Sequence, residues 1–369
     1  MPDKINNQQF RDRQFTLNPF MLLYSSYKQK KYMRSLICVI FFLTEILSCC
    51  KCKPSVVPEE LTTFVKGADV SWVTEMESSG ITFYTGSGEQ MECMALMKNL
   101  GMNTIRLRAW VNPETAWNST ADVVAKAVRA KSLGLRVMID LHYSDTWADP
   151  GAQTKPAAWA DADFAALKDS VSVYTANVLT QVKNAGVTPE WVQVGNETSN
   201  GMLWPDGKAS ENMAGFAQLV NAGYDAVKEI FPGAKVIVHT SGGADNNLSR
   251  WVFDGLTTNG ARFDVIGLSM YPSFSGWAAY HEQCLANMND LVFRYNKSVM
   301  IVEAGMPWDS PDECWSFLTD LIEKTKSVSG GKGLGVMYWE PQSHNNWKGY
   351  TLGAFDNSGK PTHAMDAFK

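Results

Sequence analysis

The feature that most constrains the fold of this chain is a regular alternation of short apolar runs with longer stretches of helical period. Eight runs rich in β-branched and aromatic residues predict strands at residues 64–72, 103–110, 136–143, 191–197, 235–241, 263–271, 298–305 and 335–341. Most of these runs are apolar almost throughout, which is typical of parallel strands covered by helices. Eight strand–helix units in about 300 residues predict an α/β chain folded as a single closed (β/α)8 TIM barrel.

The stretches between the runs predict amphipathic helices, among them residues 121–133, 165–184, 212–230 and 312–327. Gly134 directly follows the first of them, as is typical of a helix C-terminus. An open, doubly wound sheet is the alternative fold, and it would usually carry a glycine-rich phosphate loop after an early strand. Residues 70–75 read VSWVTE and lack such a loop. The sequence shows neither an internal repeat nor a second domain.

The first 62 residues divide into three segments ahead of the predicted barrel, which covers residues 63–369. Residues 1–32 are polar and predict an upstream extension that is disordered or not translated, with Met33 as the true start. Residues 33–49 have the layout of a signal peptide, with a positive flank, an apolar run and a small residue at its end. That run is shorter than the roughly 20 residues of a membrane-spanning helix. Residues 50–62 are predicted as a linker.

The residues ILSC at 46–49 resemble the lipobox of bacterial lipoproteins, in which Cys49 is lipidated and becomes the mature N-terminus. Glu45 departs from the ideal pattern, and an ordinary cleaved signal peptide or a weak anchor is the alternative. The pattern predicts an exported protein held at the outer membrane or cell surface by a lipid anchor. A periplasmic or secreted protein is the second interpretation.

Composition and motif searches exclude several classes of function. The formal net charge of −5 gives no electrostatic reason to expect a nucleic-acid partner. The five histidines form no HExxH or similar cluster, so no catalytic zinc ion is expected. Neither a GxSxG elbow nor a P-loop is present. The thirteen Trp and twelve Tyr residues suit either core packing or the stacking of sugar rings.

Three of the seven cysteines, Cys93, Cys284 and Cys314, lie in the barrel region. An odd number cannot form a complete disulfide framework. Two expectations stay open: one bridge between Cys284 and Cys314, or three buried free thiols.

Polar and aromatic side chains recur at the C-terminal ends of the predicted strands, where a barrel of this kind builds its site. In chain order they are Asp69 and Trp72; Arg106, Arg108 and Trp110; Asp140, His142 and Tyr143; Asn196 and Glu197; His239; Tyr271; Glu303; and Trp339 and Glu340. Taken singly, each could be a structural ion pair, a core histidine or a core tryptophan. Their convergence on one end of strand after strand favours a functional site, because buried carboxylates need partners.

Glu197 and Glu303 follow the fourth and seventh strands and are predicted to face each other across the barrel mouth. Such a pair suits hydrolysis of a glycosidic bond: one carboxylic acid protonates the leaving oxygen, and the other carboxylate attacks the anomeric carbon. The acid needs a raised pKa and the nucleophile a depressed one. We expect Arg106 to lie against Glu303 and to lower its pKa.

Several motifs carry a resemblance to a known family. They are GADVS at 67–71, RLRAW at 106–110, LHYSDTWADPG at 141–151, WVQVGNE at 191–197, and DVIGLS at 264–269 followed by Tyr271-Pro272. The chain resembles the large barrel clan of retaining glycosidases, and most fully glycoside hydrolase family 53, the endo-β-1,4-galactanases. The resemblance covers residues 66–369.

The resemblance implies a double displacement, with Glu197 as acid/base and Glu303 as nucleophile. It also implies that β-1,4-galactan of type I arabinogalactan and galactooligosaccharides are the partners. We further expect that no cofactor is required and that the protein is a monomer, although the sequence does not fix the oligomeric state. Some family members hold calcium in an extended last loop, but residues 339–369 show no clear motif for that ion. Residues expected to bind substrate or support the site are Asp69, Arg106, Arg108, Trp110, His142, Asp149, Asn196, Trp204, His239, Tyr271, Trp339 and Trp347.

Candidate sugar-stacking platforms are Trp72, Trp110, Trp147, Trp204, Trp339 and Trp347, and we expect about half of them to be scaffold. Two other functions stay open. One is an endo-glycanase of the same clan that acts on mannan, xylan or cellulose. The other is a glycan-binding lipoprotein without catalytic activity.

Overall fold

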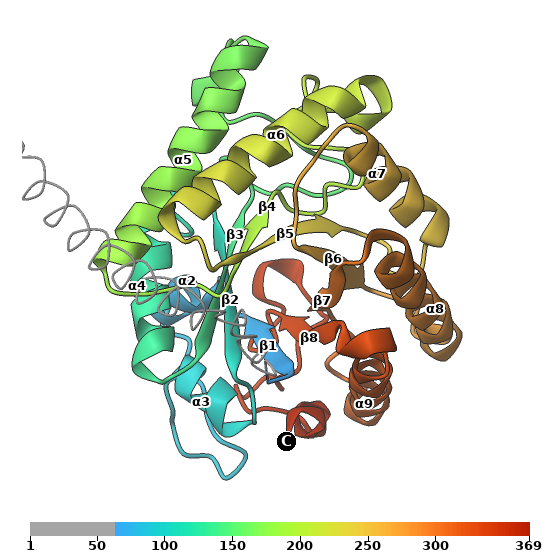
Figure 1. Cartoon of the computed structure of the whole chain (residues 1–369). Helices are drawn as coiled ribbons and strands as arrows, with labels where there is room; N and C mark the ends of the chain where they lie inside the picture. Colours follow the sequence, from blue (N-terminus) through green and yellow to red (C-terminus); the bar gives the residue numbers. More distant parts are fainter. Residues whose placement is uncertain (1–62) are drawn as a thin grey trace, which may run out of the picture. The chain divides into compact units, whose positions relative to one another are not determined.

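A computed structural model describes residues 63–369, and eight parallel strands form a closed barrel within them. Each strand pairs with its sequence neighbours, and β1 pairs with β8 to complete the ring. Figure 1 views the strands at the centre with the helices around them. The strands are β1 (Val65–Asp69), β2 (Thr104–Ala109), β3 (Arg136–Leu141), β4 (Trp191–Val194), β5 (Lys235–Thr240), β6 (Val265–Met270), β7 (Ser298–Ala304) and β8 (Gly333–Trp339).

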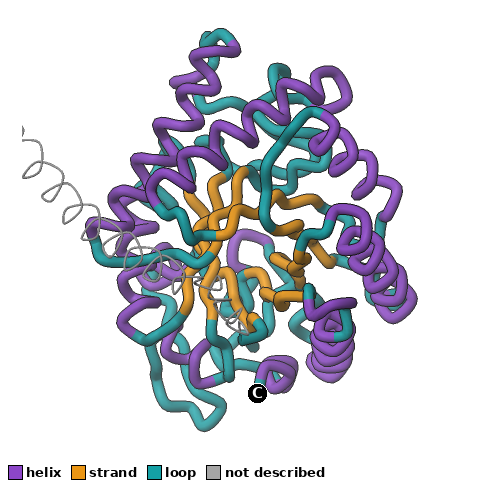
Figure 2. Tube along the Cα trace, viewed as in Figure 1, coloured by secondary structure: helices purple, strands orange, loops and turns teal. Residues whose placement is uncertain are grey.

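The helices lie outside the strands, as the colouring by secondary structure in Figure 2 makes plain. Several begin at a residue whose side chain accepts a backbone N–H of the first turn, as Asp163 does from Ala166 at the start of α5. The α-helices are α2 (Val73–Ser78), α3 (Cys93–Asn99), α4 (Thr120–Ser132), α5 (Phe164–Asn184), α6 (Ala209–Ile230), α7 (Asn246–Thr258), α8 (Trp277–Tyr295) and α9 (Pro311–Lys326). None of the helices in residues 63–369 is long and apolar enough to cross a membrane.

The barrel region contains two apolar clusters of buried side chains. The larger one includes Ile105 and Leu107 of β2 and joins the strands to the surrounding helices. The smaller one fills the barrel interior toward the start of the strands, with Trp191 as its largest side chain. Because successive residues of a strand point to opposite faces, Arg106 and Arg108 point into the barrel at its other end.

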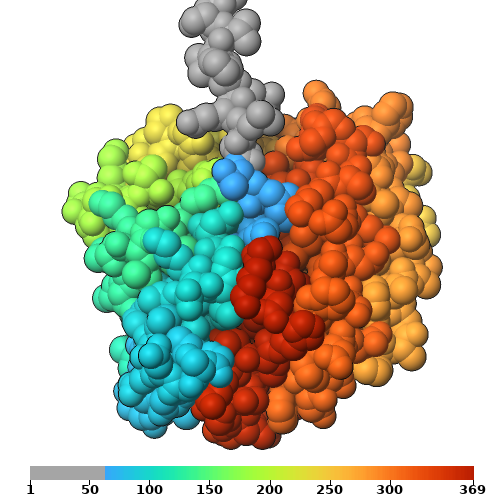
Figure 3. Space-filling view, turned by 90° about the horizontal axis from the view of Figure 1, so that it is seen from below, coloured from blue at the N-terminus to red at the C-terminus, as the bar shows by residue number. Residues whose placement is uncertain are grey.

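The two ends of the barrel region meet at the seam between β1 and β8. Nζ of Lys66, on β1, donates to the backbone oxygens of Phe368 and Lys369 at 2.9 and 3.0 Å. Figure 3 shows these last residues, in red, beside the blue start of β1 and between the cyan and orange parts of the chain. The last 3₁₀ helix, η4 (His363–Phe368), therefore covers the seam where the barrel closes.

The predicted (β/α)8 barrel is confirmed. All eight strands fall within or beside their predicted ranges; the main difference is that several end earlier than predicted, so that His142, Glu197 and Tyr271 follow their strands, while Glu303 lies within β7. The β4 pairing stops at Val194, since Gly195 and Glu197 have φ values of 81° and 43° and leave extended geometry. The predicted extension, the lipoprotein signal with Cys49 and the linker all lie outside the described residues.

The three cysteines of the barrel, Cys93, Cys284 and Cys314, are buried and free. The expectation of free thiols is confirmed, and the alternative of a Cys284–Cys314 bridge is wrong. Cys284 lies on α8 and Cys314 on α9, and both are core side chains of their helices. Burial in apolar surroundings raises the pKa of each of these two thiols to about 12.

Candidate active site

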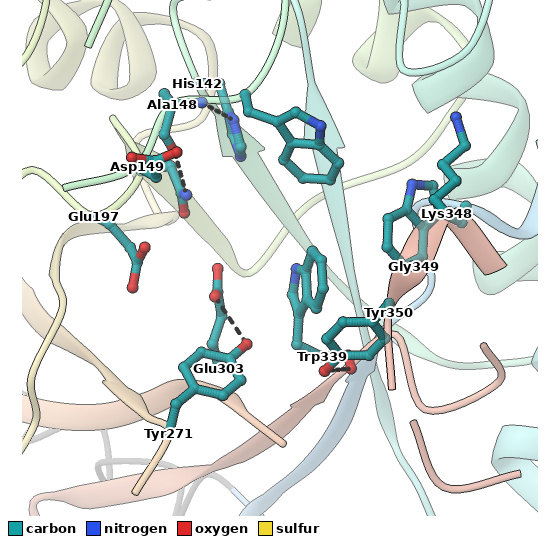
Figure 4. A pocket seen from close by; sticks show the side chains of 13 residues that line it. His142, Ala148, Asp149, Glu197, Tyr271, Glu303, Trp339, Lys348, Gly349 and Tyr350 are labelled. Atoms are coloured by element: carbon teal, nitrogen blue, oxygen red, sulfur yellow. Dashed lines mark hydrogen bonds between the residues drawn. The ribbon is translucent and has the colours of Figure 1, made fainter. Parts of the chain in front are cut away.

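A cavity of about 490 Å³ opens at the C-terminal ends of the strands, where a barrel of this kind carries its chemistry. Its wall combines acidic groups at one end with aromatic rings at the other (Figure 4). The residues that line it are Trp72, His142, Trp147, Ala148, Asp149, Asn196, Glu197, Tyr271, Glu303, Trp339, Lys348, Gly349 and Tyr350.

Arg106 is the central cation beneath this cavity and is fully buried. Its Nη1 lies 2.8 Å from Oδ2 of Asp69 and 2.9 Å from Oε1 of Glu303. Its Nη2 lies 2.9 Å from Oδ2 of Asp140. Although burial opposes the charge, Asp140 and Glu303 raise the pKa of Arg106 above its ordinary value. A permanently charged guanidinium thus holds three carboxylates from β1, β3 and β7 in one network.

Glu303 ends in the cavity with both carboxyl oxygens contacted. Oε1 faces Arg106, and Oε2 accepts the Tyr271 hydroxyl at 3.1 Å. Only 6% of Glu303 is exposed, so the carboxyl is reached from the cavity alone. The predicted contact between Arg106 and Glu303 is present.

Glu197 lies opposite, and Figure 4 shows its carboxyl group turned toward that of Glu303. Its φ of 43° is in the left-handed region, which a non-glycine residue adopts only where the surroundings hold it. Two anchors do so: the backbone N–H of Glu197 points at Nδ1 of His239, 3.3 Å away, and Oε1 accepts the Ser269 hydroxyl at 2.7 Å.

Both glutamates hold a proton more tightly than an ordinary carboxyl group does. Burial raises the pKa of Glu197, and the hydrogen bond from Ser269 opposes that rise. Burial also raises the pKa of Glu303 to about 8, with Arg106 acting in the opposite direction. Arg106 therefore lowers the pKa of Glu303, as predicted, but burial outweighs it, so the expectation of a depressed pKa at the nucleophile is wrong. Arg106 is shared with Asp69 and Asp140, so its charge does not offset burial at Glu303.

Two neighbouring carboxyl groups with raised pKa values titrate as a pair, and near neutral pH the pair keeps a proton. Glu303 is contacted by a cation and by a phenol hydroxyl, both of which favour its anion. Within the part of the chain that the structure describes, the side chain of Glu197 receives a single neutral donor, from Ser269. The contacts thus favour a charged Glu303 opposite a protonated Glu197.

The aromatic end of the cavity rests on a second buried arginine. The guanidinium carbon of Arg108 lies 4.3 Å from the ring centroid of Trp147, and 5.3 to 6.0 Å from three other indoles. Its Nε and Nη2 have no hydrogen-bond partner among the described residues, and Nη1 reaches Oε1 of Glu340 at 3.4 Å. Arg108 is thus held mainly by indole faces; the other three indoles are those of Trp72, Trp110 and Trp339.

The structure separates the predicted residues into three groups. Those that line the cavity are His142, Asp149, Asn196, Glu197, Tyr271, Glu303 and Trp339. Those buried beneath or beside it are Asp69, Arg106, Arg108 and His239. Those outside its lining are Trp110, Trp204 and Trp347, while Trp72, Trp147 and Trp339 are the proposed platforms that do line it.

Several residues of the site were missed as site residues by sequence reasoning. Tyr350 lines the cavity and packs at 4.8 Å, ring centroid to centroid, on Trp339. Lys348 also lines it and pairs with Glu75 at 2.7 Å. Ser269 contacts Glu197, but a serine in an apolar strand gives no signal of that. The aromatic residues of the 347–350 segment were the available hint for Tyr350.

His142 and His239 are the histidines of the site, and burial lowers the pKa of both imidazoles, so both are neutral near pH 7. Nε2 of His142 contacts Oδ2 of Asp140 at 2.9 Å, which orients the ring. Within residues 63–369, no group of three or more His, Cys, Asp or Glu side chains is arranged to hold a metal ion.

Comparison with known proteins decides the family. The model of a family described as glycosyl hydrolase family 53 matches residues 65–368 of the chain. The chain belongs to glycosyl hydrolase family 53. This family 53 protein is a glycosidase, and the cavity at the strand ends is its candidate active site.

Relatives of this family 53 glycosidase include named galactanases and solved structures. The arabinogalactan endo-β-1,4-galactanase of Thermothelomyces thermophilus is 31% identical, over 82% of this chain and 98% of that protein. A structure described as one of two fungal β-1,4-galactanases superimposes with a TM-score of 0.78 at 31% identity, covering 83% of this chain and 99% of the other. The family 53 catalytic domain of Ignisphaera aggregans gives a TM-score of 0.77 at 30% identity, covering 85% and 97%.

Proposed function

We propose that this glycosidase cleaves β-1,4-galactosidic bonds within galactan and type I arabinogalactan, by a retaining double displacement. The observation that carries the proposal is the unequal setting of the two glutamates across one cavity: among residues 63–369, a cation contacts Glu303 and none contacts Glu197. The family's galactanases support the choice of substrate.

In the first step, a lone pair of the Glu303 carboxylate attacks the anomeric carbon of the sugar beside it. The bond from that carbon to the glycosidic oxygen breaks, and the proton of Glu197 passes to the leaving oxygen. Tyr271 and Arg106 hold Glu303 from two sides, which aims the carboxylate and favours its charged form.

In the second step, Glu197, now a carboxylate, takes a proton from water while the water oxygen attacks the same anomeric carbon. The bond to Glu303 breaks and Glu303 leaves as a carboxylate. Two inversions at one carbon retain the β configuration. His142, Asn196 and Asp149 supply polar groups along the cavity for sugar hydroxyls.

The aromatic end supports binding of a chain rather than of a single sugar. Trp72, Trp147, Trp339 and Tyr350 form one continuous group of rings, with centroid separations of 4.8 to 5.9 Å between neighbours. Flat apolar faces of this kind match the C–H faces of sugar rings. We propose that they hold the sugars on the Glu303 side of the scissile bond.

Substitution of the two glutamates tests the assignment. Glu197→Gln and Glu303→Gln keep the side-chain shape and remove the acid or the nucleophile, so each should lower kcat on linear galactan by at least about a thousandfold. Glu282→Gln, an exposed carboxyl on α8, is the matched control and should keep wild-type activity. Near-full activity of either active-site variant would show that its role is wrong.

A panel of polymers tests the substrate. Reducing-sugar release from galactan, mannan, xylan and cellulose should be confined to galactan, with mixed oligosaccharides appearing before single sugars. Hydrolysis of another polymer without galactan hydrolysis would favour a different clan activity. Binding without hydrolysis of any polymer would favour the non-catalytic alternative.

We propose further that the protein is an exported lipoprotein that acts at the cell surface as a monomer. The support is the lipobox-like segment at 46–49, which precedes the barrel in the sequence. Metabolic labelling with a fatty acid should mark the wild type but not a Cys49→Ser variant. Equal labelling of both would contradict lipidation at Cys49.

A further inference from the structure

A serine and a histidine connect to Glu197 in a chain of short contacts. Ser269 lies on β6 and is 2% exposed, with its side chain at the barrel mouth. Its Oγ is 2.7 Å from Oε1 of Glu197 and 2.8 Å from Nε2 of His239. His239 lies on β5 and is fully buried. The chain therefore runs from a buried imidazole to the carboxyl group through one hydroxyl.

The direction of these hydrogen bonds follows from the surroundings of the imidazole. His239 is neutral, because burial and the nearby Arg106 lower its pKa well below the ordinary value, so the ring carries one N–H. The backbone N–H of Glu197 points at Nδ1, which therefore presents a lone pair. Asn196 Oδ1, 3.0 Å from the same nitrogen, accepts instead from Nη2 of Arg106 at 2.9 Å. We assign the ring hydrogen to Nε2, which faces Ser269.

We propose that His239 and Ser269 form a directional relay that positions the catalytic proton of Glu197. Nε2–H of His239 donates to Oγ of Ser269. Because Nε2 carries a hydrogen, it cannot accept from the Ser269 hydroxyl, and this hydroxyl therefore donates to Oε1 of Glu197. The inference rests on the acid/base role given to Glu197 under the proposed function. Ser269 and His239 act through Glu197 and are positioning residues.

The consequence concerns which oxygen of Glu197 carries the proton. An oxygen that accepts a hydrogen bond from Ser269 cannot also present its own proton there without a clash. The proton is therefore kept on Oε2, for which no hydrogen bond is found among the described residues. Because the proton of Glu197 always lies on Oε2, the acid can protonate the leaving oxygen without first moving its proton from one carboxyl oxygen to the other. In the second step, the same donor stabilises the Glu197 carboxylate.

Other charged groups around Glu197 cannot replace the relay. Arg106 lowers the pKa of Glu197 from a distance but contacts Glu303, and Asp140 and Asp149 raise it. Tyr271 donates to Glu303. Among the described residues, Ser269 is the side chain that donates to the carboxyl group of Glu197.

The pH dependence of kcat/KM on linear galactan tests the relay, because its basic limb reports deprotonation of the acid/base in the free enzyme. Ser269→Ala removes a donor to the carboxylate, so the pKa of Glu197 should rise and the basic limb should move to a pH about one unit higher. Ser269→Thr keeps the hydroxyl and should restore the wild-type limb. With a dinitrophenyl β-1,4-galactobioside, whose leaving group needs no proton, Ser269→Ala should form the glycosyl-enzyme at the wild-type rate.

Ser343→Ala is the matched control, since it removes a buried hydroxyl that has no partner in the described barrel, and it should leave the basic limb at the wild-type pH. A downward shift in Ser269→Ala would mean that Ser269 accepts a proton from Glu197, and an unshifted limb would mean that the contact is inert. Either result overturns the relay if Glu197→Gln is inactive on galactan. A Glu197→Gln variant with wild-type activity would overturn the proposed function itself, and the relay with it.

Discussion

Replacing Arg108 by methionine should loosen the aromatic end of the cavity without touching Glu197 or Glu303. Arg108 is 1% exposed and lies beneath the three indoles that line the cavity, those of Trp72, Trp147 and Trp339. Methionine fills a similar volume and removes the charge. The tryptophans then lose the cation that they surround, while the Arg106 network keeps all of its contacts.

The magnitude follows from the geometry of the four rings. A desolvated cation–π contact contributes about 2 kcal/mol, and we count each of the three longer contacts at the low end of the range, about 0.5 kcal/mol. The guanidinium carbon is 4.3 Å from Trp147 and 5.3 to 6.0 Å from the other three rings, so the sum is about 3–4 kcal/mol. Sulfur–aromatic contacts of methionine recover about 1 kcal/mol. The net loss in the free energy of unfolding is thus about 2–3 kcal/mol.

Urea denaturation measures that loss, and steady-state kinetics measure its effect on binding. KM for long galactooligosaccharides should rise about tenfold, which corresponds to about 1.4 kcal/mol of lost binding. kcat on a dinitrophenyl galactobioside should change by less than about twofold, because the reacting groups keep their contacts. Tryptophan fluorescence should also change, since the indoles lose a neighbouring cation.

Arg136→Met is the matched control. The guanidinium carbon of Arg136 lies 4.4 Å from the ring centroid of Trp191, and its side chain also pairs with Glu190. Since Trp191 belongs to the interior cluster at the start of the strands, this variant should lose stability and keep the wild-type KM. If Arg108→Met kept both the wild-type free energy of unfolding and the wild-type KM, the stabilising role of the Arg108 guanidinium among the four indoles would be refuted.

Three further predictions follow from single contacts. Tyr271→Phe removes a donor to Glu303 and should lower kcat about tenfold, measured on galactan, with folding unchanged by circular dichroism. Asp149→Asn removes a charge that raises the pKa of Glu197, so the basic limb of kcat/KM should move downward, opposite to Ser269→Ala. Burial raises the pKa of Glu340 to about 8, so the folded state binds more protons than the unfolded one above the ordinary value of 4.5. The free energy of unfolding should therefore fall as pH rises from 5 to 8, less steeply in Glu340→Gln, as urea titrations would measure.

The fold could be predicted because parallel strands buried on both faces are apolar runs, and each of the eight runs became a strand. The ends of the runs were less certain for a physical reason. Tyr143 and Glu197 follow their apolar runs directly in the sequence and were therefore predicted as strand residues. Their φ values of 52° and 43° leave extended geometry, so the strand pairing ends before them. Tertiary contacts hold such residues in the left-handed backbone conformation, and hydrophobic periodicity does not predict where these contacts form.

The charged part of the site was predictable because its members lie at or just beyond the C-terminal ends of strands that open at one mouth, as Glu303 and Glu197 do. The aromatic part was only half predictable. Trp204 and Trp339 look alike in sequence, but Trp339 lines the cavity, while the Trp204 indole N–H donates to the backbone oxygen of Asn200, outside the cavity lining. The contact of Ser269 with Glu197 joins residues 72 positions apart and depends on the register of two strands.

The configuration of the first product tests the central claim most directly. If Glu303 forms a covalent intermediate that water then opens with help from Glu197, each cut creates a reducing end in the β configuration. Proton NMR of linear galactan, recorded before mutarotation equilibrates the anomers, should show the β-anomeric signal growing first. An α-anomeric signal that grew first would mean inversion and would contradict the roles given to Glu197 and Glu303.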